Sequence, residues 1–401
     1  MKILILSQWF QPEPFFKGLP FAQALQDRGH DVEVLTGFPN YPGGKLYPGY
    51  RLGLWQRETI DGIRVNRVAL YPSHDRSGIR RMVNYLSFGL SSALIGPLLI
   101  KKPDIIYVYN LVTLGPAAGL LRLLYGCPVV YDIQDICPDS VINSGMMHSF
   151  FLLKILERCC RFIYKQASHC VVLSPGFKKK LADMGIPPEN VSVIYNWCDE
   201  TALAGDKSAP SEKITGSFKI VFAGAMGTVQ ALDAVLEAAE LLRHPYPDIQ
   251  FVFVGGGVEV GCLKQKAGNL GLSNVSFLPQ RPMTEIGKIL DQADVLLVHL
   301  KDDPLFSITI PSKTQAYMAF GKPILMGVRG DAADLVRRAN AGICCIPEDP
   351  RSIADAAIAL YAAPLEKRNA MGRCAKAFYA DNLSQQAGVE SFERLFKAVA
   401  P

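Results

Sequence analysis

The stretch Phe218–Gly227, with the sequence FKIVFAGAMG, decides the fold class of this chain. It is an apolar run that ends in a glycine-rich turn, and a helical pattern follows over Gln230–Leu242. The unit repeats at once, because Ile249–Gly257, with the sequence IQFVFVGGG, leads into a second helical pattern over Val258–Asn269. A buried strand, a tight glycine turn and a covering helix in succession predict a parallel sheet flanked by helices.

The same alternation runs outward through both halves of the chain. We expect strands at Lys2–Ser7, Val32–Thr36, Asp104–Tyr109, Pro128–Ile133, Cys170–Leu173 and Val191–Tyr195, and again at Phe218–Ala223, Ile249–Val254, Val275–Leu278, Val295–Leu300, Pro323–Met326 and Ile343–Ile346. The stretch Leu54–Leu70 alternates around Asp61-Gly62 and predicts an antiparallel hairpin. The chain therefore reads as α/β, with an N-terminal Rossmann-like domain over 1–200, a linker over 201–217, a C-terminal Rossmann-like domain over 218–382 and a final helix within 383–401.

Composition and charge limit the function classes. Hydrophobic residues make up 49% of the 401 residues and charged residues 20%, which predicts a substantial core and excludes global disorder. A net charge of +5 is too mild for a dedicated nucleic-acid binder. Residues 1–205 carry 21 basic and 16 acidic side chains, whereas residues 206–401 carry 21 of each. Seven arginines predict either a basic surface for a phosphate-bearing or membrane partner, or an ordinary solvated face: Arg51, Arg57, Arg64, Arg67, Arg76, Arg80 and Arg81.

Cysteine usage and hydropathy favour a cytoplasmic protein. The ten cysteines include no Cys-x-x-Cys pair, which fits a reduced compartment. The apolar run Met1–Ser7 is too short for a signal peptide. The longer run Val83–Ile100 lies between two basic pairs, but it is short for a membrane span and contains Asn84 and Pro97. A buried domain helix is the preferred reading, and a helix lying in the membrane interface is the second.

Three segments of the second half offer groups that suit an anion. The glycine turns at Gly224, Gly227 and Gly256 present backbone N–H groups and the positive end of a helix, although each can also be a plain turn. Ser312 and Lys313 open a further helix behind a proline, and a lysine serves as a point-charge partner for phosphate. No G-x-G-x-x-G follows the first strand and no His/Cys cluster has metal spacing, so we expect neither a nicotinamide or flavin cofactor nor a metal.

The first half supplies carboxylates at the end of a predicted strand. Asp132, Gln134 and Asp135 follow or end Pro128–Ile133, at the sheet edge where ligands of such folds bind. They could accept hydrogen bonds from sugar hydroxyls or take a proton from one, and helix capping is the alternative for Asp135. Gly18 precedes a helical pattern, where it could let a phosphate or sugar approach or simply form a turn.

Taken together, the order and spacing of these motifs resemble glycosyltransferase family 4, which has the GT-B architecture of two facing Rossmann-like domains with a cleft between them. Besides Gly18, the motifs lie at Tyr131–Ser140, Val171–Gly176, Tyr195–Trp197, Phe222–Gly227, Phe253–Gly257 and Ile310–Leu325. Within this family the chain is most similar to the WbuB type, assigned as L-fucosamine transferases of O-antigen and capsule pathways. The stretches MKILILSQWF, VLTGFPNYPGGK and LYPSHDRS carry that closer match.

The resemblance implies a retaining, metal-independent transfer of a sugar from a UDP-sugar, without a cofactor. The acceptor would be a polyprenyl-diphosphate-linked saccharide, and the enzyme would contact the cytosolic face of the inner membrane peripherally. Lys313, Ser312 and the glycine turns would stabilise the departing diphosphate, and backbone near Pro279 would contact the base. The acceptor and membrane side would include Arg76, Arg80, Arg81 and Gln134.

The chain departs from the family pattern at three places. Ile308 and Ala316 stand where the family commonly has two glutamates eight residues apart, so ribose contact passes to Gln315 or to backbone. Ala225 and Thr228 replace a basic residue in the first glycine turn, which leaves more of the diphosphate charge to Lys313.

The third departure is Gln134, which stands where many family members have a histidine, so Asp132 or Asp135 becomes the candidate for handling the acceptor proton. Two other functions stay open at this point. One is a nucleotide-sugar epimerase of the UDP-GlcNAc 2-epimerase type on the same scaffold, and the other is a binding protein without catalysis.

Overall fold

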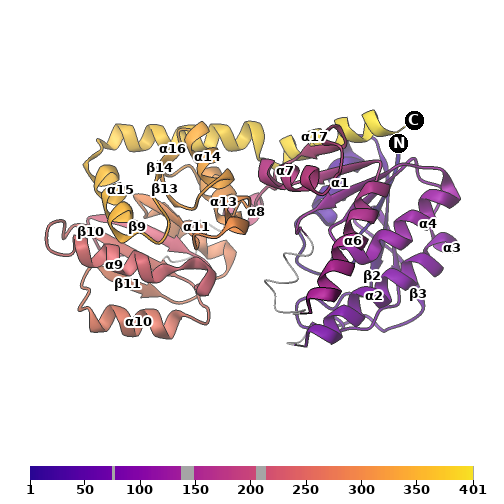
Figure 1. Ribbon diagram of the computed structural model, residues 1–401, viewed down its shortest axis with the longest axis horizontal. Helices are drawn as coiled ribbons and strands as arrows, with labels where there is room; N and C mark the ends of the chain where they lie inside the picture. Colours follow the sequence, from indigo (N-terminus) through magenta and orange to yellow (C-terminus); the bar gives the residue numbers. More distant parts are fainter. Residues whose placement is uncertain (75–76, 137–148, 205–213, 401) are drawn as a thin grey trace. The chain divides into compact units, whose positions relative to one another are not determined.

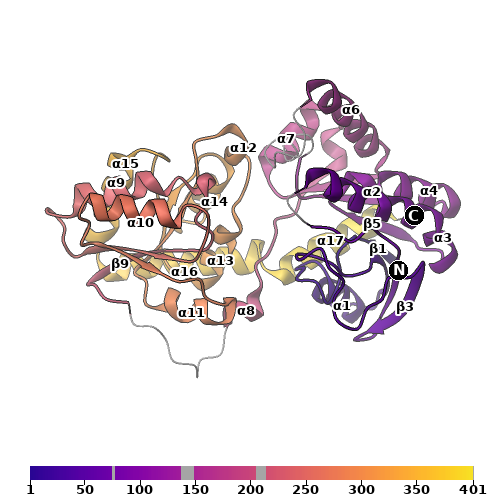
Figure 2. The same ribbon diagram turned by 90° about the horizontal axis from the view of Figure 1, so that it is seen from below.

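A computed structural model of the chain describes residues 1–74, 77–136, 149–204 and 214–400 (Figure 1). The chain divides into two compact units, unit 1 with Met1–Ile194 and Val389–Pro401, and unit 2 with Tyr195–Gly388. Each unit is a largely parallel sheet with helices on both faces (Figures 1 and 2). The predicted α/β fold of two Rossmann-like domains is confirmed.

Unit 1 contains an eight-stranded sheet in the order β3-β4-β2-β1-β5-β6-β7-β8. Every pairing is parallel except that of β3 with β4, which form the predicted hairpin at one edge. Its turn uses Asp61 and Gly62, both with positive φ, as a two-residue hairpin requires. The strands are β1 Lys2–Leu6, β2 Asp31–Gly37, β3 Trp55–Ile60, β4 Ile63–Val68, β5 Ile105–Tyr109, β6 Val129–Ile133, β7 His169–Val172 and β8 Val191–Val193.

The prediction of a buried domain helix over Val83–Ile100 is wrong on burial, because Val83, Leu86, Leu90, Leu94 and Leu98 are exposed. The apolar run predicted as one helix over Val83–Ile100 forms two, since α2 ends at Leu94 and α3 starts at Gly96 with Pro97 in its first turn. No helix in the described ranges is both long and apolar enough to cross a bilayer. The helices are α1 Leu19–Asp27, α2 Gly78–Leu94, α3 Gly96–Leu99, α4 Gly115–Tyr125, α6 Phe150–Gln166 and α7 Pro175–Asp183.

Unit 2 contains a six-stranded parallel sheet in the order β11-β10-β9-β12-β13-β14. Its strands are β9 Phe218–Ala223, β10 Ile249–Val254, β11 Val275–Leu278, β12 Val295–His299, β13 Ile324–Gly327 and β14 Gly342–Cys344. Its helices are α8 Glu200–Ala204, α9 Leu232–Leu242, α10 Val260–Asn269, α11 Met283–Asp291, α12 Pro304–Ser307, α13 Ser312–Phe320, α14 Asp331–Arg338, α15 Pro350–Ala362 and α16 Leu365–Asn382.

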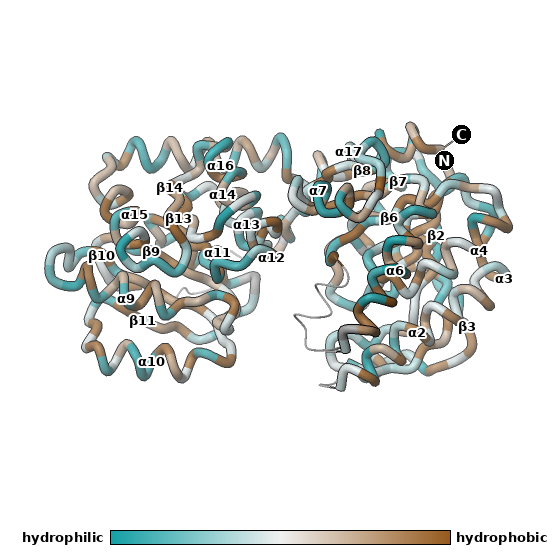
Figure 3. Tube along the Cα trace, viewed as in Figure 1, coloured by the Kyte–Doolittle hydropathy of each residue, from teal (hydrophilic) through white to brown (hydrophobic). Residues whose placement is uncertain are grey.

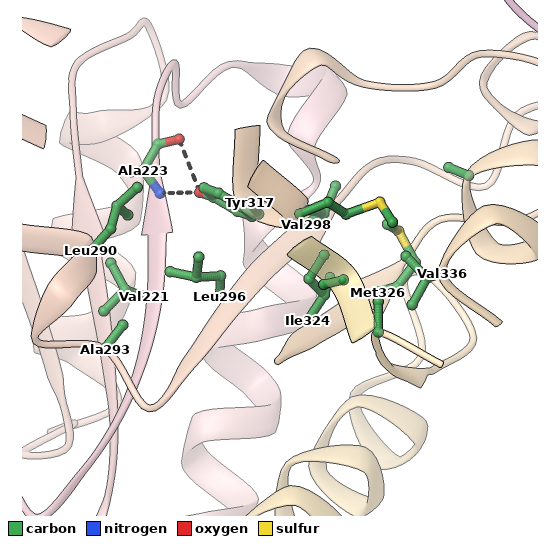
Figure 4. Packing of buried hydrophobic residues seen from close by; sticks show 14 of the residues in the cluster. Val221, Ala223, Leu290, Ala293, Leu296, Val298, Tyr317, Ile324, Met326 and Val336 are labelled. Carbon is green, nitrogen blue, oxygen red and sulfur yellow. Dashed lines mark hydrogen bonds between the residues drawn. The ribbon is translucent and has the colours of Figure 1, made fainter. Parts of the chain in front are cut away.

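The core of unit 2 lies on both faces of the sheet because successive strand residues point in opposite directions. Val221 and Ala223 of β9 join the cluster under α11, α13 and α14 (Figure 4). Ile220 and Phe222 of the same strand join the cluster under α9 and α15. Strands buried on both faces are therefore continuous apolar runs, which is the pattern seen in the sequence.

The chain crosses between the units twice, and residues beside both crossings are held together within unit 2. Tyr379 Oη donates to Glu200 Oε1 at 2.8 Å and accepts from the backbone N–H of Cys198 at 3.3 Å. The ring of Trp197 lies against Gly388, where a Cβ atom would come within 2.6 Å of it. The segment predicted as a linker thus begins with α8, which packs on α11 and α13.

The last helix, α17 Gln385–Val399, runs from unit 2 to unit 1. Its Phe392 and Phe396 are fully buried and pack on Tyr107 of β5, with Phe392 also against Phe21 of α1. Arg28 forms ion pairs with Glu390 and Glu393 of this helix. Unit 1 is therefore completed by residues from the far end of the chain.

Candidate functional site

In unit 2, hydrogen bonds connect helix α13 to the end of strand β9. Tyr317 is buried, and its hydroxyl accepts from the backbone N–H of Ala223 at 2.9 Å and donates to the Ala223 carbonyl at 3.3 Å (Figure 4). Tyr317 follows Lys313 by one helical turn, so both side chains lie on the same side of α13. The strand end and the helix start are held at a fixed spacing.

Lys313 lies over the first glycine turn. A Cβ atom at Gly224 would come within 2.5 Å of Lys313 Cε, so the lysine occupies the space that glycine leaves free. The ammonium lies 3.5 Å from the centroid of the Phe222 ring. Desolvation by burial lowers the pKa of Lys313 to about 7. In the part of the chain that the structure describes, no carboxylate pairs with this lysine, so it can take an anionic ligand as its partner.

The two glycine turns are locked to each other by backbone hydrogen bonds. Gly224 N–H donates to Val254 O and Met226 N–H donates to Gly256 O, both at 2.8 Å, and Gly227 N–H donates to Gln230 Oε1 at 2.9 Å. The prediction that the amides of Gly224 and Gly227 bind an anion is therefore wrong for these two N–H groups. What the glycines provide is close packing and room for Lys313.

The helix start supplies a second group for an anion. Pro311 is the N-cap of α13 without a side-chain cap, and Ser312 is exposed as its first residue. Gln315 is buried, and its amide nitrogen, facing the Pro311 carbonyl, lies 2.6 Å from that oxygen. This amide is engaged by its own helix, which gives no support to the predicted contact of Gln315 with ribose.

The third segment predicted for the donor follows β11. Gly256 is the middle residue of the glycine turn that follows β10. A Cβ atom at Gly256 would come within 3.1 Å of Gln280 Oε1. Pro279 and Gln280 are both exposed, and they lie directly after the carboxyl end of β11. Gly256, Pro279 and the Lys313 region thus occupy the carboxyl-end edge of one sheet, where ligands of such folds bind.

A pocket of about 330 Å³ opens beside Gly227 and Thr228. Its lining includes one lysine, Lys301, and four carboxylates, namely Asp233, Glu237, Glu259 and Glu348. Lys266 pairs with Asp233 and Glu237, but the lining still carries more acidic than basic groups, so the pocket itself is unsuited to a diphosphate. Carboxylates and one lysine are suited to hydroxyl groups instead.

In unit 1, Asp132 proves to be a buried structural residue. One carboxylate oxygen accepts from Lys17 Nζ and Tyr107 Oη, both at 2.6 Å, and the other accepts from Gln134 Nε2. Asp132 and Lys17 are at most 1% exposed. Burial lowers the pKa of Lys17 and the charge of Asp132 opposes that shift. The prediction of Asp132 as a catalytic base is wrong, because its carboxylate is enclosed and already accepts three hydrogen bonds.

Asp135, in contrast, is exposed directly after β6, and a neighbouring asparagine orients its carboxylate by a hydrogen bond. Asn110, which follows β5 in a left-handed conformation, donates to Asp135 Oδ2 at 3.0 Å. Asn110 Oδ1 in turn accepts from the backbone N–H groups of Gln134 and Asp135, both at 3.1 Å. Of the two predicted carboxylates, Asp135 alone is placed to meet a ligand, while Gln134 holds Asp132.

Gly18 also has a packing role. A Cβ atom there would come within 2.7 Å of Gln11 Oε1, which accepts from the backbone N–H of Leu19 at 3.0 Å. The side chain of Gln11 thus occupies the start of α1, the position predicted for a phosphate or sugar. Gly18 belongs to unit 1, whereas the other candidate donor residues belong to unit 2.

Three of the seven arginines predicted as one basic surface are engaged by neighbouring residues. Arg67 is fully buried and donates to Glu58 and to the backbone of Gly37 and Gln11. Arg64 pairs with Asp31, and Arg57 donates to Asn66 and Leu99. Arg80 is exposed, Arg81 is half-buried, and Arg76 lies outside the described residues.

Sequence reasoning missed two residues, Glu13 and Asn110, that hold loops at the carboxyl ends of strands in unit 1. Glu13 accepts backbone N–H groups from Asn40 and Tyr41 at 2.7 Å and from Phe10 at 3.1 Å, which joins the loops after β1 and β2. A charged residue inside an apolar loop beside Phe10 was the available signal. For Asn110, the signal was its position directly after a buried parallel strand. Within the described ranges, no three His, Cys, Asp or Glu side chains gather as metal ligands do.

Comparison with known proteins matches both halves of the chain to family models. Residues 19–197 match the glycosyl transferase 4-like domain, and residues 205–378 match glycosyl transferases group 1. WcaI of Escherichia coli (strain K12), named as a glycosyl transferase of colanic acid biosynthesis, is 28% identical over 343 residues, which are 80% of this chain and 82% of WcaI. WbjE of Pseudomonas aeruginosa, named as a glycosyltransferase, is 26% identical over 59% of this chain and 60% of its own length.

Solved structures agree on the fold. HepE of Anabaena in complex with UDP aligns over 99% of this chain and 100% of its own, with a TM-score of 0.68 and 16% identity. A UDP-forming α,α-trehalose-phosphate synthase from Burkholderia vietnamiensis aligns over 99% of both chains, with a TM-score of 0.70 and 14% identity. At these identities the likeness establishes the GT-B architecture of two Rossmann-like domains.

Proposed function

Because this chain is a glycosyltransferase, built from a glycosyl transferase 4-like domain and a group 1 domain, we propose that it transfers a sugar from a UDP-sugar to a lipid-diphosphate-linked saccharide. The product belongs to the biosynthesis of a bacterial surface polysaccharide. The name of WcaI supports the pathway class, and the UDP complex of HepE supports the nucleotide.

The observation that carries the proposal is the position of Lys313. Its ammonium lies over a glycine turn at the carboxyl end of β9 and at the start of α13, with no carboxylate partner among the described residues. A half-buried cation beside a positive helix end stabilises the charge that develops on a departing diphosphate. This is the role that a transferase needs when no metal neutralises the leaving group.

The finer assignments are part of the same proposal. The transfer retains the anomeric configuration, proceeds without a metal or cofactor, and takes N-acetyl-L-fucosamine as its sugar. Asp135 accepts a hydrogen bond or a proton from the acceptor hydroxyl, because it is exposed at the carboxyl end of β6 and oriented by Asn110. The acceptor stays in the cytosolic leaflet of the inner membrane, which the enzyme contacts peripherally near Arg76, Arg80 and Arg81.

Calorimetric titration with UDP tests the donor site. We expect Lys313→Ala to weaken UDP binding about ten- to a hundredfold, the range for a lost hydrogen bond to a charged group. The matched control is Lys367→Ala, which removes an exposed lysine of α16 in the same unit and should leave affinity unchanged. Equal affinities for the wild-type protein and Lys313→Ala would contradict the assignment.

A donor panel tests the reaction. UDP-sugars are incubated with a lipid-diphosphate-linked N-acetylglucosamine acceptor, and the products are identified by mass spectrometry. We expect one donor to be consumed only when the acceptor is present, and the Asp135→Asn variant to bind UDP normally while transferring more slowly. Conversion of a donor without acceptor would instead identify a nucleotide-sugar epimerase.

A further inference from the structure

One face of the unit 1 sheet is covered by helices that present large apolar side chains to solvent. The connections from β4 to β5, β5 to β6 and β6 to β7 run in one direction across the sheet, so right-handed crossovers place α2, α4 and α6 on the same face. Figures 1 and 2 show these helices side by side, and α4 packs on both neighbours. We call the outer surface of α2, α3, α4 and α6 the helical face.

This face holds most of the exposed apolar side chains. Of 21 large apolar side chains exposed among the described residues, five belong to unit 2 and twelve to the helical face. They are Ile79, Val83, Leu86, Leu90 and Leu94 on α2, Leu98 on α3, Leu123 and Leu124 on α4, and Phe151, Leu152, Ile155 and Phe162 on α6. Scattered exposed apolar residues are normal, but a set concentrated on one surface marks an interaction site.

The outward side of α2 is almost wholly apolar. Its exposed residues follow one another by four, three, four and four positions from Ile79 to Leu94, which places them in one stripe along the helix. Arg80 is the one exposed residue of α2 outside this stripe. Asn84 and Phe88, on the opposite side, are buried against the unit. Since the buried side also carries the polar residues Asn84 and Ser92, the more apolar side of α2 faces outward, which solvent alone does not favour.

The outward side of α6 carries two parallel stripes. Phe151, Ile155 and Phe162 are exposed along one line, and Lys154, Arg158, Arg161 and Lys165 are exposed along the adjacent line at spacings of four, three and four. In Figure 3 hydrophobic and hydrophilic residues alternate along this helix. An apolar stripe beside a basic stripe is the pattern of a helix that lies in a membrane interface.

Charge identifies the occupant of the helical face. The four helices contain seven basic residues and a single acidic one, Glu157, which pairs with Arg161. A second copy of this chain, docked by two-fold symmetry, would bring like-charged stripes together. An anionic bilayer surface offers the opposite charge to the basic stripe and a hydrocarbon layer to the apolar ones.

From this geometry we infer that unit 1 docks on an anionic phospholipid bilayer through the helical face, with α6 and α2 lying in the interface plane. The inference deepens the proposed function, on which it rests for the lipid-linked acceptor. It extends the membrane contact from α2 to α4 and α6, and it gives the arginines near Arg80 a smaller part than the basic stripe of α6. The acceptor's diphosphate then lies at the level of the basic stripe of α6.

Flotation of the intact protein tests the inference, with vesicles of phosphatidylcholine alone and of phosphatidylcholine mixed with phosphatidylglycerol. We expect binding to the mixed vesicles. The variants Leu90→Gln/Leu94→Gln and Phe151→Gln/Phe162→Gln should each weaken binding at least about tenfold, because several methylene groups leave the hydrocarbon layer. The variant Arg158→Gln/Lys165→Gln should weaken it about tenfold or more at low salt and much less at high salt.

The matched control is Val258→Gln/Leu365→Gln, which changes two exposed apolar residues of unit 2 and should leave vesicle binding intact. No binding of the wild-type protein to either vesicle overturns the inference, and so does a dimer in solution that Leu90→Gln/Leu94→Gln converts to monomers. UDP calorimetry separates the two proposals. Normal UDP binding without vesicle binding would contradict only the docking inference. Vesicle binding without UDP binding would contradict only the assignment of the donor site.

Discussion

Lys313 shows how burial can make one side chain sensitive to pH near neutrality. Its pKa of about 7 in the free protein means that at higher pH the ammonium must regain a proton before it can pair with a diphosphate. We expect UDP affinity to fall by up to about tenfold per pH unit above 7, and to level off below 7. Calorimetry in two buffers of different ionisation enthalpy should show proton uptake on UDP binding at alkaline pH.

The neutral variant Lys313→Met provides the control for this effect. Its UDP affinity should not change between pH 7 and 9, and the advantage of the wild-type protein over it should shrink as pH rises. Phosphate groups titrate near pH 6 and are fully ionised across this window. A constant ratio of the two affinities would show that Lys313 carries its charge throughout.

Glu13 is the second residue whose burial has a measurable consequence. Desolvation raises its pKa to about 7 from 4.5, although backbone N–H groups of Tyr41, Asn40 and Phe10 favour the ionised form. A raised pKa means that its contribution to stability is fully present below pH 4.5 and is lost as pH rises through 7. We expect Glu13→Gln to be less stable than the wild-type protein at pH 4.5, since one backbone N–H then faces an amide nitrogen.

The difference between the two proteins should shrink by about 2–3 kcal/mol between pH 4.5 and 7, where the wild-type protein loses the advantage of the neutral carboxyl. Urea unfolding at a series of pH values measures this difference directly. A stability difference that grows with pH would mean that the three N–H groups outweigh desolvation.

At the scale of elements, α13 depends on one hydroxyl for its position against β9. In Tyr317→Phe the Ala223 N–H loses its partner in a buried setting, so the free energy of unfolding should fall by about 1–3 kcal/mol. Loss of this anchor should also weaken UDP binding, because Lys313 lies one turn away. Tyr361→Phe, which removes an exposed hydroxyl bonded to Asp248, should change stability by less than about 0.5 kcal/mol. Equal effects of both substitutions would contradict the anchoring role.

The two interlocked glycine turns are a second element with a strict requirement. Gly257 has a φ of 149°, and a Cβ atom there would collide with the backbone carbonyl of Met226. Gly257→Ala should therefore lower the free energy of unfolding by about 2 kcal/mol or more. Gly261→Ala, in the adjacent helix α10 with open space around the site, should instead raise it by up to about 1 kcal/mol. Thermal unfolding of both variants decides the point.

Elements differed in how well the sequence revealed them. The strands of unit 2 were predicted because burial on both faces makes each one a continuous apolar run. Helix α16 was missed, because it buries small or single residues such as Gly372, Ala375 and Tyr379 and so shows no broad apolar stripe. At the site, the predicted places of Asp135 at a strand end and of Lys313 at a helix start agree with the structure, while their roles stay predictions. Asp132 was misjudged because its partner Lys17 is distant in sequence.

For the molecule as a whole, unit 1 depends on the last helix. Phe392 is fully buried against Phe21 and Tyr107, and the Lys17 ammonium lies 5.0 Å from its ring centroid. Phe392→Ala should destabilise unit 1 by about 3–5 kcal/mol, as for other buried aromatic residues, and leave unit 2 unchanged. Differential scanning calorimetry should show one of two transitions moving to lower temperature.

Glu390→Ala is the control on the same helix, since it removes a partner from an exposed ion pair with Arg28 and should cost less than about 1 kcal/mol. If Phe392→Ala shifted both transitions together, the two units would unfold as one. The loss of stability could then not be assigned to unit 1 alone.

The discontinuity of unit 1 also sets an order of events during protein synthesis. The residues of α17 that close over Lys17 and Asp132 leave the ribosome only after all of unit 2, roughly ten to forty seconds later at ordinary rates of elongation. Through that interval a nascent unit 1 lacks the aromatic cover of its buried ion pair, while unit 2 is free to fold. A ribosome stalled within unit 2 therefore leaves unit 1 without α17. Chaperones and proteases can recognise the exposed hydrophobic surface that Phe392 and Phe396 would otherwise cover.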